Sequence, residues 1–344
     1  MIKHILLILL FPTLLVSQAP VFLGKPLAVE ELSYELDASG NQNPTARWAM
    51  IYHFDDAGRL SEHWSKTPGE KDFLNHTVHT YMGEHPLKSV QTGPKGNIQE
   101  TLEHFYDETG KLVRILKTGP IAAFNQDMEV VTDSLDRIVW IKSQKPKGNE
   151  PPEITENVFT DDTLAVSTTR DATGQVKGTW TRRMNDQGDL LYFVQTNETG
   201  AVVHEAHYFD YAYDDAGNWT ERKSRTRYTL FGEERKIQAH DIRRIVYPGE
   251  YPETLTPSYL QGSWAGFLYG LQLDFFADGT YLAYTWESRK DGGQWTLDTQ
   301  KNILSVTGKE HRETSVPLDF RYENGAIILY KPGAEGEVRL VKLK

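Results

Sequence analysis

One short motif recurs between about residue 50 and about residue 225: Asp, two variable residues, Gly, one more residue and an apolar residue. Its clearest copy is YDDAGNWT at 213–220. An Asp at the first position of a type I turn accepts hydrogen bonds from the backbone that follows, and a left-handed Gly closes a bulged hairpin. Each copy therefore predicts a tight turn between two antiparallel strands.

The copies differ in spacing and in their first residue. Asn replaces Asp at Asn185 and Asn197, and a degenerate copy places Asp136 where Gly is expected, a position that Asp tolerates better than most residues. The predicted structural turn residues are Asp55, Gly58, Asp107, Gly110, Asp171, Gly174, Gly188, Gly200, Asp214 and Gly217.

The runs between the turns alternate apolar and polar residues, as at Trp48, Met50, Tyr52 and Phe54, which is typical of strands. With its aromatic residue before the turn, the motif resembles the tyrosine-aspartate (YD, or Rhs-type) repeat over about residues 50–225. Long members of that family build large closed shells. Few and unevenly spaced copies here predict an all-β chain whose antiparallel hairpins form an extended or curled sheet.

The first 19 residues read as a Sec-type signal peptide, with Lys3, an apolar run over 5–16 and small residues for cleavage after Ser17 or Ala19. No later run is long enough to predict a transmembrane segment in the mature chain. The chain has no cysteine, which excludes disulfides, thiolate metal sites and a lipidated cysteine. We therefore expect a secreted, periplasmic or cell-surface protein, of the bacterial envelope type.

The 344 residues are expected to divide into two folded units. A proline-rich linker at 248–257 separates a repeat domain at 20–247 from a second domain at 258–344. The net charge of −11 argues against a nucleic-acid partner. The basic stretch at 222–227 has alternating charges and is interpreted as a solvated strand face.

The second domain contains Gly-x-Trp, then Phe-x-Ala-Asp-Gly-Thr-Tyr, then Gly-x-Trp-x-Leu, with tight hairpins at Asp278-Gly279 and Asn324-Gly325. This order resembles the compact lipocalin-like domains and predicts a small antiparallel β-barrel at 258–344. Its aromatic residues either line a ligand cup or fill the core. The candidate ligand-binding residues are Trp264, Phe275, Tyr284, Trp286 and Trp295.

No catalytic, metal or cofactor site is predicted. His204 and His207 are three apart in a strand and point to opposite faces, so they cannot share a metal. His53, His63 and His104 are expected to be half-exposed strand residues beside turns. The acidic pairs repeat at one turn position, which indicates turn formation rather than calcium binding or glycosidase chemistry.

Three functions remain open. The first is a non-catalytic exported binding or structural protein that contacts a protein or glycan through its hairpin-repeat surface. The second is a carrier of a small hydrophobic ligand in the C-terminal barrel, and the third is an extracellular polysaccharide hydrolase. Glycan contact requires exposed tryptophans on one face, and the candidates are Trp64, Trp140, Trp180 and Trp219.

Overall fold

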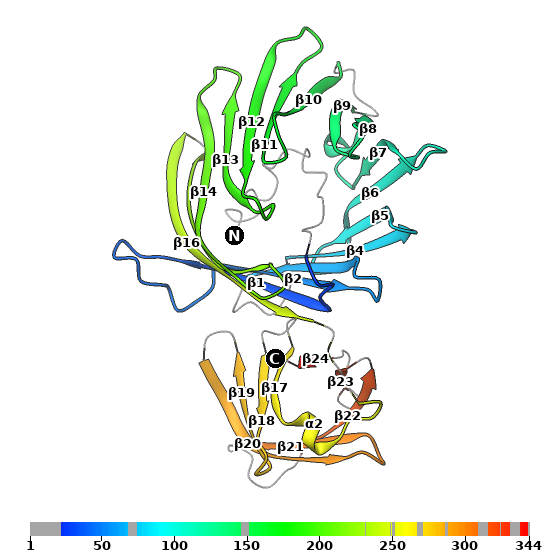
Figure 1. The fold of residues 1–344 in the computed structure, drawn as a ribbon, viewed down its shortest axis with the longest axis vertical. Coiled ribbons are helices and arrows are strands. Elements are labelled where there is room, and N and C mark those ends of the chain that lie inside the picture. Colours follow the sequence, from blue (N-terminus) through cyan, green and yellow to red (C-terminus); the bar gives the residue numbers. More distant parts are fainter. Residues whose placement is uncertain are drawn as a thin grey trace.

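The chain forms two closed antiparallel β-barrels, one of sixteen strands and one of eight (Figure 1). The structure is a computed structural model and describes residues 22–67, 74–145, 151–230, 232–247, 249, 252–266, 271–285, 288–308, 316–323, 325–330 and 338–342. The predicted signal peptide lies outside the described residues. No helix in the described ranges is long and apolar enough to cross a membrane.

The strands of the large barrel are β1 (Ala28–Glu35), β2 (Trp48–Phe54), β3 (Leu60–Lys66), β4 (Asn75–Met82), β5 (His85–Thr92), β6 (Ile98–Tyr106), β7 (Leu112–Thr118), β8 (Gln126–Thr132), β9 (Ile138–Gln144), β10 (Glu153–Phe159), β11 (Leu164–Arg170), β12 (Val176–Met184), β13 (Leu190–Asn197), β14 (Val202–Tyr213), β15 (Trp219–Leu230) and β16 (Glu233–Val246). A 3-10 turn, η1 (Ala122–Phe124), lies between β7 and β8. Each strand pairs with its sequence neighbours.

The large sheet closes on itself because β1 pairs with β16, from Ala28 opposite Val246 to Glu35 opposite Ala239. The all-β prediction is confirmed; the predicted extended or curled sheet is not open, because it curls until its two edges pair and form a closed barrel. Sixteen hairpin-linked strands leave one unpaired edge at each end of the sheet, and joining those edges satisfies their backbone groups. We call the pairing of β1 with β16 the closure seam.

The Asp-x-x-Gly copies form the turns between these strands. The Oδ1 of Asp214 accepts hydrogen bonds from the backbone N–H of Ala216 (3.0 Å) and Asn218 (2.9 Å), and Gly217 has φ +89°. The degenerate copy keeps this geometry with Asp136 at φ +56°. Several ladders shift register by one residue next to the turn, as at His53/Phe54 and Arg183/Met184, which is the bulge that accompanies this turn.

The small barrel consists of β17 (Gly262–Gly266), β18 (Leu271–Phe275), β19 (Thr280–Thr285), β20 (Ser288–Asp298), β21 (Ile303–Gly308), β22 (Val316–Glu323), β23 (Ala326–Tyr330) and β24 (Val338–Lys342), and β24 pairs back to β17. The predicted small barrel is confirmed. A short helix, α2 (Pro257–Leu260), precedes it, with Thr256 as N-cap. Leu255 and Leu260 pack into the core of the small barrel.

The two barrels meet in one apolar cluster. Ala28, Ile51, Trp64 and Val246 of the large barrel pack with Ala265, Ala326 and Val341 of the small one. Figure 1 shows the small barrel below β1 and β2, next to the closure seam. The outer face of the large barrel is therefore the face that carries Ile51 and Trp64.

Candidate functional site

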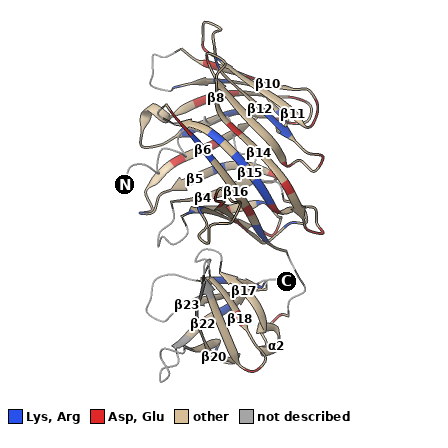
Figure 2. Cartoon of the chain, turned by 90° about the vertical axis from the view of Figure 1, so that its left-hand side faces the viewer, with Lys and Arg blue, Asp and Glu red and all other residues tan. Residues whose placement is uncertain are grey.

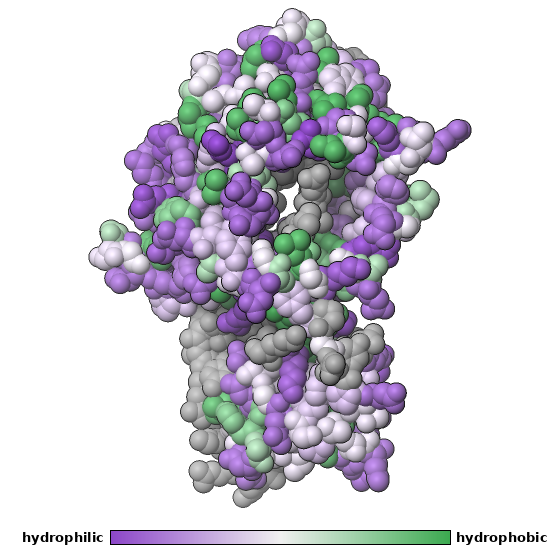
Figure 3. Space-filling model, viewed as in Figure 1, coloured by the Kyte–Doolittle hydropathy of each residue, from purple (hydrophilic) through white to green (hydrophobic). Residues whose placement is uncertain are grey.

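The inner wall of the large barrel can be assigned from this contact. Ile51 and Trp64 are opposite each other on β2 and β3 and point outward, against the small barrel. Successive strand residues alternate in direction, so the adjacent pair, Tyr52 and His63, points into the barrel. Figure 3 shows the large barrel hollowed at its centre. The inner wall therefore lines a lumen.

Four charged side chains form a network on the inner wall at the closure seam. The Nε of Arg222 donates to Asp241 Oδ2 (3.0 Å), and its Nη2 lies 3.5 Å from Glu31 Oε1. The Nε of Arg243 donates to Glu31 Oε2 (2.9 Å). Only 4–6% of the two carboxylate side chains is exposed, and 11–14% of the two arginine side chains. We call these residues the seam network.

Aromatic rings enclose the arginines of the seam network. The Trp219 ring centre lies 3.6 Å from the Arg243 guanidinium carbon and 4.1 Å from that of Arg222, and Tyr208 covers Arg222 at 4.4 Å. Burial alone would lower the pKa of Arg222, but Glu31 and Asp241 outweigh it and raise that pKa. The charges are paired two by two, so the network joins strands and supplies no free acid, base or nucleophile.

A row of histidines continues the inner wall on the other side of Tyr52. His63 Nδ1 and His79 Nε2 are 3.0 Å apart, and His79 Nδ1 lies 2.8 Å from Ser89 Oγ. Burial, with nearby histidines as a second cause, lowers the pKa of His63 and of His79 to about 4. Both rings are therefore neutral near pH 7. His104 is 7% exposed, so the expectation of a half-exposed residue is wrong there.

A row of half-buried aromatic and polar side chains lies on the inner wall from β12 to β15. Trp180, Gln195, His204 and Tyr228 are successive register partners across these four strands, and all are half-buried. The rings of His204 and Tyr228 approach edge to face at 6.1 Å. We call these four residues the lumen row. They place two aromatic rings, an amide and an imidazole at one level of the inner wall.

The outer wall carries ion pairs between neighbouring strands. Figure 2 shows basic and acidic positions along the strands of the large barrel, including β6, β14 and β15. They include Lys88–Glu103 (3.0 Å), Arg114–Asp127 (2.7 Å), Lys142–Glu129 (3.1 Å) and Arg227–Glu205 (2.6 Å). Two of them, with Gln144, line an open hollow of about 180 Å³. These charges are already paired with each other.

A second outward cluster lies beside the contact between the barrels. Glu62 accepts from His76 Nε2 (3.0 Å) and lies 3.5 Å from His53 Nδ1. Trp64 stacks on His76 with ring centres 4.7 Å apart. Burial alone would raise the pKa of Glu62, but hydrogen bonds from His53 and His76 outweigh it and lower the pKa to about 2. Glu62 is engaged by both histidines as a hydrogen-bond and ion-pair partner, and the described residues hold no group of three side chains that could bind a metal ion.

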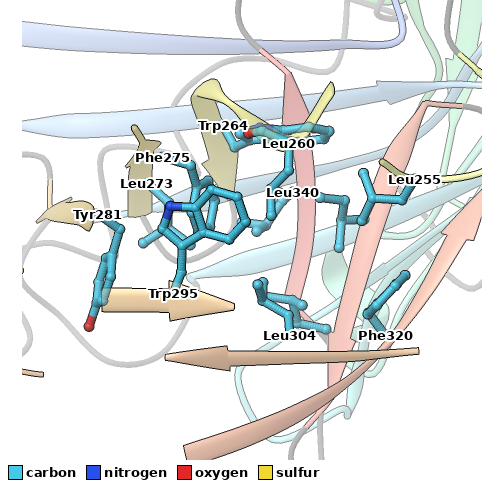
Figure 4. Close-up of a cluster of buried hydrophobic side chains, with 12 residues drawn as sticks. Leu255, Leu260, Trp264, Leu273, Phe275, Tyr281, Trp295, Leu304, Phe320 and Leu340 are labelled. Atoms are coloured by element: carbon cyan, nitrogen blue, oxygen red, sulfur yellow. The ribbon is translucent and has the colours of Figure 1, made fainter. Parts of the chain in front are cut away.

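The sequence-predicted ligand residues lie in the core of the small barrel. Trp264 is 0% exposed, Phe275 2% and Trp295 8%, and Figure 4 shows them in one cluster with Leu273 and Leu340. The indole N–H groups of Trp264 and Trp295 donate to the carbonyls of Leu260 (2.7 Å) and Phe276 (3.2 Å). Trp286 and the side chain of Tyr284 lie outside the described residues.

The four tryptophans considered for glycan contact do not share an exposed face. Trp64 (5% exposed) and Trp219 (1%) are buried, on opposite faces of the wall. Trp180 points into the lumen, whereas Trp140 pairs with outward Val131. The interpretation of 222–227 also needs correction: Lys223, Arg225 and Arg227 are exposed, but Arg222 lies on the opposite face of the strand, points inward and pairs there with Asp241 and Glu31.

Sequence reasoning missed the seam network entirely. Its members lie on β1, β15 and β16, and Arg222 and Glu31 are 191 positions apart. The available signal was the run Ala28–Glu35, in which two adjacent carboxylates interrupt a strand that is buried on both faces. A charged pair inside a buried strand requires partners, but the partners could not be chosen without the ring closure.

Comparisons with known proteins give no family for this chain. No family model and no curated protein matches it. A porin-like protein from Bacteroides uniformis is similar in structure over 65% of this chain and 98% of its own, at 13% identity and a TM-score of 0.42. A TcdB2–TccC3 structure matches 88% of this chain at 10% identity and a TM-score of 0.24. The Tc holotoxin pore of Photorhabdus luminescens matches 90% of this chain at 15% identity and a TM-score of 0.23. This chain spans only 16–17% of those two proteins.

Proposed function

We propose that this protein is a non-catalytic exported binding protein, whose large barrel is a water-facing shell that contacts a protein or glycan from its inner wall. The observation that carries the proposal is the distribution of side chains over the two faces. The outer wall holds ion pairs at mid-strand, and the half-buried aromatic lumen row lies inside. Binding surfaces are enriched in aromatic rings with polar groups beside them.

The outer wall also supports an aqueous location, in the periplasm or outside the cell. A lipid-facing barrel needs an apolar band, and a Lys or Arg side chain there costs about 2–4 kcal/mol at the bilayer midplane. Ion pairs such as Arg114–Asp127 lie on the outward face of neighbouring strands. We therefore expect the mature protein to be monodisperse in detergent-free buffer; aggregation that only detergent relieves would contradict this location.

The lumen is tested with single cysteines, because the chain has none of its own. Gln195→Cys places a thiol in the lumen row, and Val194→Cys places one on the outward face of the same strand. We expect a small maleimide to label both variants, and a bulky polyethylene-glycol maleimide to label only Val194→Cys. Failure of the small reagent to label folded Gln195→Cys would overturn the proposal of an accessible lumen.

The same thiols identify the partner class. Oligosaccharides and unstructured peptides are added as protectants before labelling, and we expect one of these classes to slow the labelling of Gln195→Cys but not of Val194→Cys. Equal rates with and without both classes would count against binding at the lumen row. Among the side chains that the structure describes, no comparable arrangement supports the hydrolase or the small-barrel carrier.

A further inference from the structure

The first described residues of the chain form a strap, residues 22–27, across the barrel rim at the closure seam. Leu27 joins the main-chain ladder: its N–H donates to Val246 O (2.7 Å), and its carbonyl accepts from Phe54 N (3.1 Å). Upstream, Gly24 and Lys25 both have positive φ, +74° and +49°. This conformation is unfavourable for Lys and turns the chain away from the strand direction.

The turn directs Phe22 into an aromatic pocket on the inner wall. The Phe22 ring lies 5.3 Å from Phe54, edge to face, and 5.8 Å from Tyr52. The Arg243 guanidinium of the seam network covers the same ring at 4.9 Å. The pocket thus offers two rings and a cation to one aromatic side chain, a combination that favours aromatic over aliphatic residues.

The next residue of the strap is held by one amide side chain. The backbone N–H of Leu23 donates to Asn218 Oδ1 (2.8 Å), and Asn218 Nδ2 donates to the Leu23 carbonyl (2.9 Å). Asn218 Nδ2 also donates to the Tyr247 hydroxyl, which in turn donates to Asp214. Asn218 is 5% exposed with the strap in place, and its hydrogen bond to Tyr247 holds the amide by a contact that does not involve the strap.

These contacts recognise a main-chain unit, not the Leu23 side chain. That side chain is 47% exposed, whereas both hydrogen-bonding groups of the residue are used. A side-chain amide that accepts from N–H and donates to C=O of one residue reads an extended peptide of any sequence. The adjacent pocket then selects an aromatic residue immediately before it.

We propose that Asn218 and the pocket of Tyr52, Phe54 and Arg243 form a peptide-binding site, which the chain's own strap occupies and from which another extended peptide with an aromatic residue can displace it. This inference rests on the proposed binding role of the inner wall and names an extended polypeptide as its partner. The strap is held there by side-chain contacts upstream of a strained turn, so its release leaves the barrel ladder intact.

The test uses the full chain and a fluorescently labelled peptide with the sequence of residues 21–27. Phe22→Ala weakens the strap's hold on its own site, so we expect saturable peptide binding, measured by anisotropy, that is about tenfold or more tighter than to the unaltered protein. The double variant Phe22→Ala/Asn218→Ala also lacks both side-chain hydrogen bonds to the main chain of the peptide. Its peptide binding should be weaker than that of Phe22→Ala by about tenfold or more. A peptide with Ala in place of Phe should not bind.

The matched control is Gln175→Ala, which changes the same turn position in another copy and should leave binding unchanged. No saturable binding to folded Phe22→Ala would overturn the proposal. Should that variant not fold, amide hydrogen exchange in the unaltered protein decides: we expect Leu23 to be protected, and the protection to be lost in Asn218→Ala. A Leu23 amide that exchanges like that of an unstructured peptide would also overturn it. The labelling of Gln195→Cys reads the lumen independently of the strap.

Discussion

Arg222 and Arg225 lie three positions apart on β15 and have opposite surroundings. Arg222 is buried between Glu31 and Asp241, whereas Arg225 is exposed on the outer wall over Phe209. Arg222→Ala leaves two buried carboxylates short of a partner and should lower the free energy of unfolding by about 3–5 kcal/mol. Arg225→Ala should lower the free energy of unfolding by about 1 kcal/mol or less. Urea denaturation of both variants measures the difference, and equal costs would contradict the seam network.

The turn residues give a second prediction at this scale. Asp136→Gly should raise stability by about 0.5–1 kcal/mol, because Asp136 has φ +56° and glycine adopts that conformation without strain. Gly217→Ala should lower it by more than Gly174→Ala, since a Cβ at Gly217 meets Leu23 at 3.2 Å and one at Gly174 meets nothing within 4 Å. Denaturation midpoints that rank Gly174→Ala as the costlier change would show that the strap does not rest on this turn.

At the scale of elements, the histidine pair of β3 and β4 should make stability depend on pH. The folded pKa of about 4 for His63 and His79 lies below the ordinary value of 6.5, so the unfolded chain takes up protons first as pH falls. Stability is therefore full above about pH 6.5 and should fall toward pH 4 by roughly 3 kcal/mol for each of the two histidines.

His79→Gln should reduce this dependence, and His207→Gln is the control because His207 is exposed on the outer wall. The measurement is the free energy of unfolding by urea across this pH range. A His79→Gln protein with the pH dependence of the unaltered one would assign the effect to other groups.

The small barrel yields a prediction about its core. Its interior is occupied by large side chains, with Trp264 fully buried and Phe275 packed edge to face on Trp295 at 5.7 Å. Trp264→Ala should therefore cost about 3–5 kcal/mol in stability. The unaltered protein should not bind a hydrophobic fluorophore in this barrel. Saturable fluorophore binding that Trp264→Ala abolishes at unchanged stability would instead make the tryptophan a ligand contact.

How far the elements follow from sequence depends on the range of the interaction. A turn is decided by residues four positions apart, such as Asp214 and Asn218, so the hairpins could be read from the spacing. The closure seam depends on β1 meeting β16, and no local pattern fixes that pairing. Strand alternation alone puts Arg222 on the face opposite Lys223. That this face is enclosed and carries Glu31 follows only from the ring closure.

For the whole molecule, the apolar contact beside the seam should hold the two barrels together. Val341 lies in this contact, whereas Arg339, two residues earlier on β24, is exposed. Val341→Asp buries an unpaired carboxylate and should weaken the contact by about 3 kcal/mol or more. Small-angle scattering should then show a more extended molecule, with faster proteolysis between residues 247 and 257. Arg339→Asp should leave both readouts unchanged.

The closure seam also constrains how the chain can reach this structure. Ser33 and Asp241, hydrogen-bonded across it, are 208 positions apart. β1 therefore forms early in synthesis but waits for its second partner until nearly the whole repeat region has emerged. Contacts of such long sequence separation slow folding, and an unpaired strand edge is prone to intermolecular pairing. The yield of refolded protein should accordingly fall, through aggregation, as the protein concentration rises. β1 is the segment that a chaperone would have to bind until β16 is available.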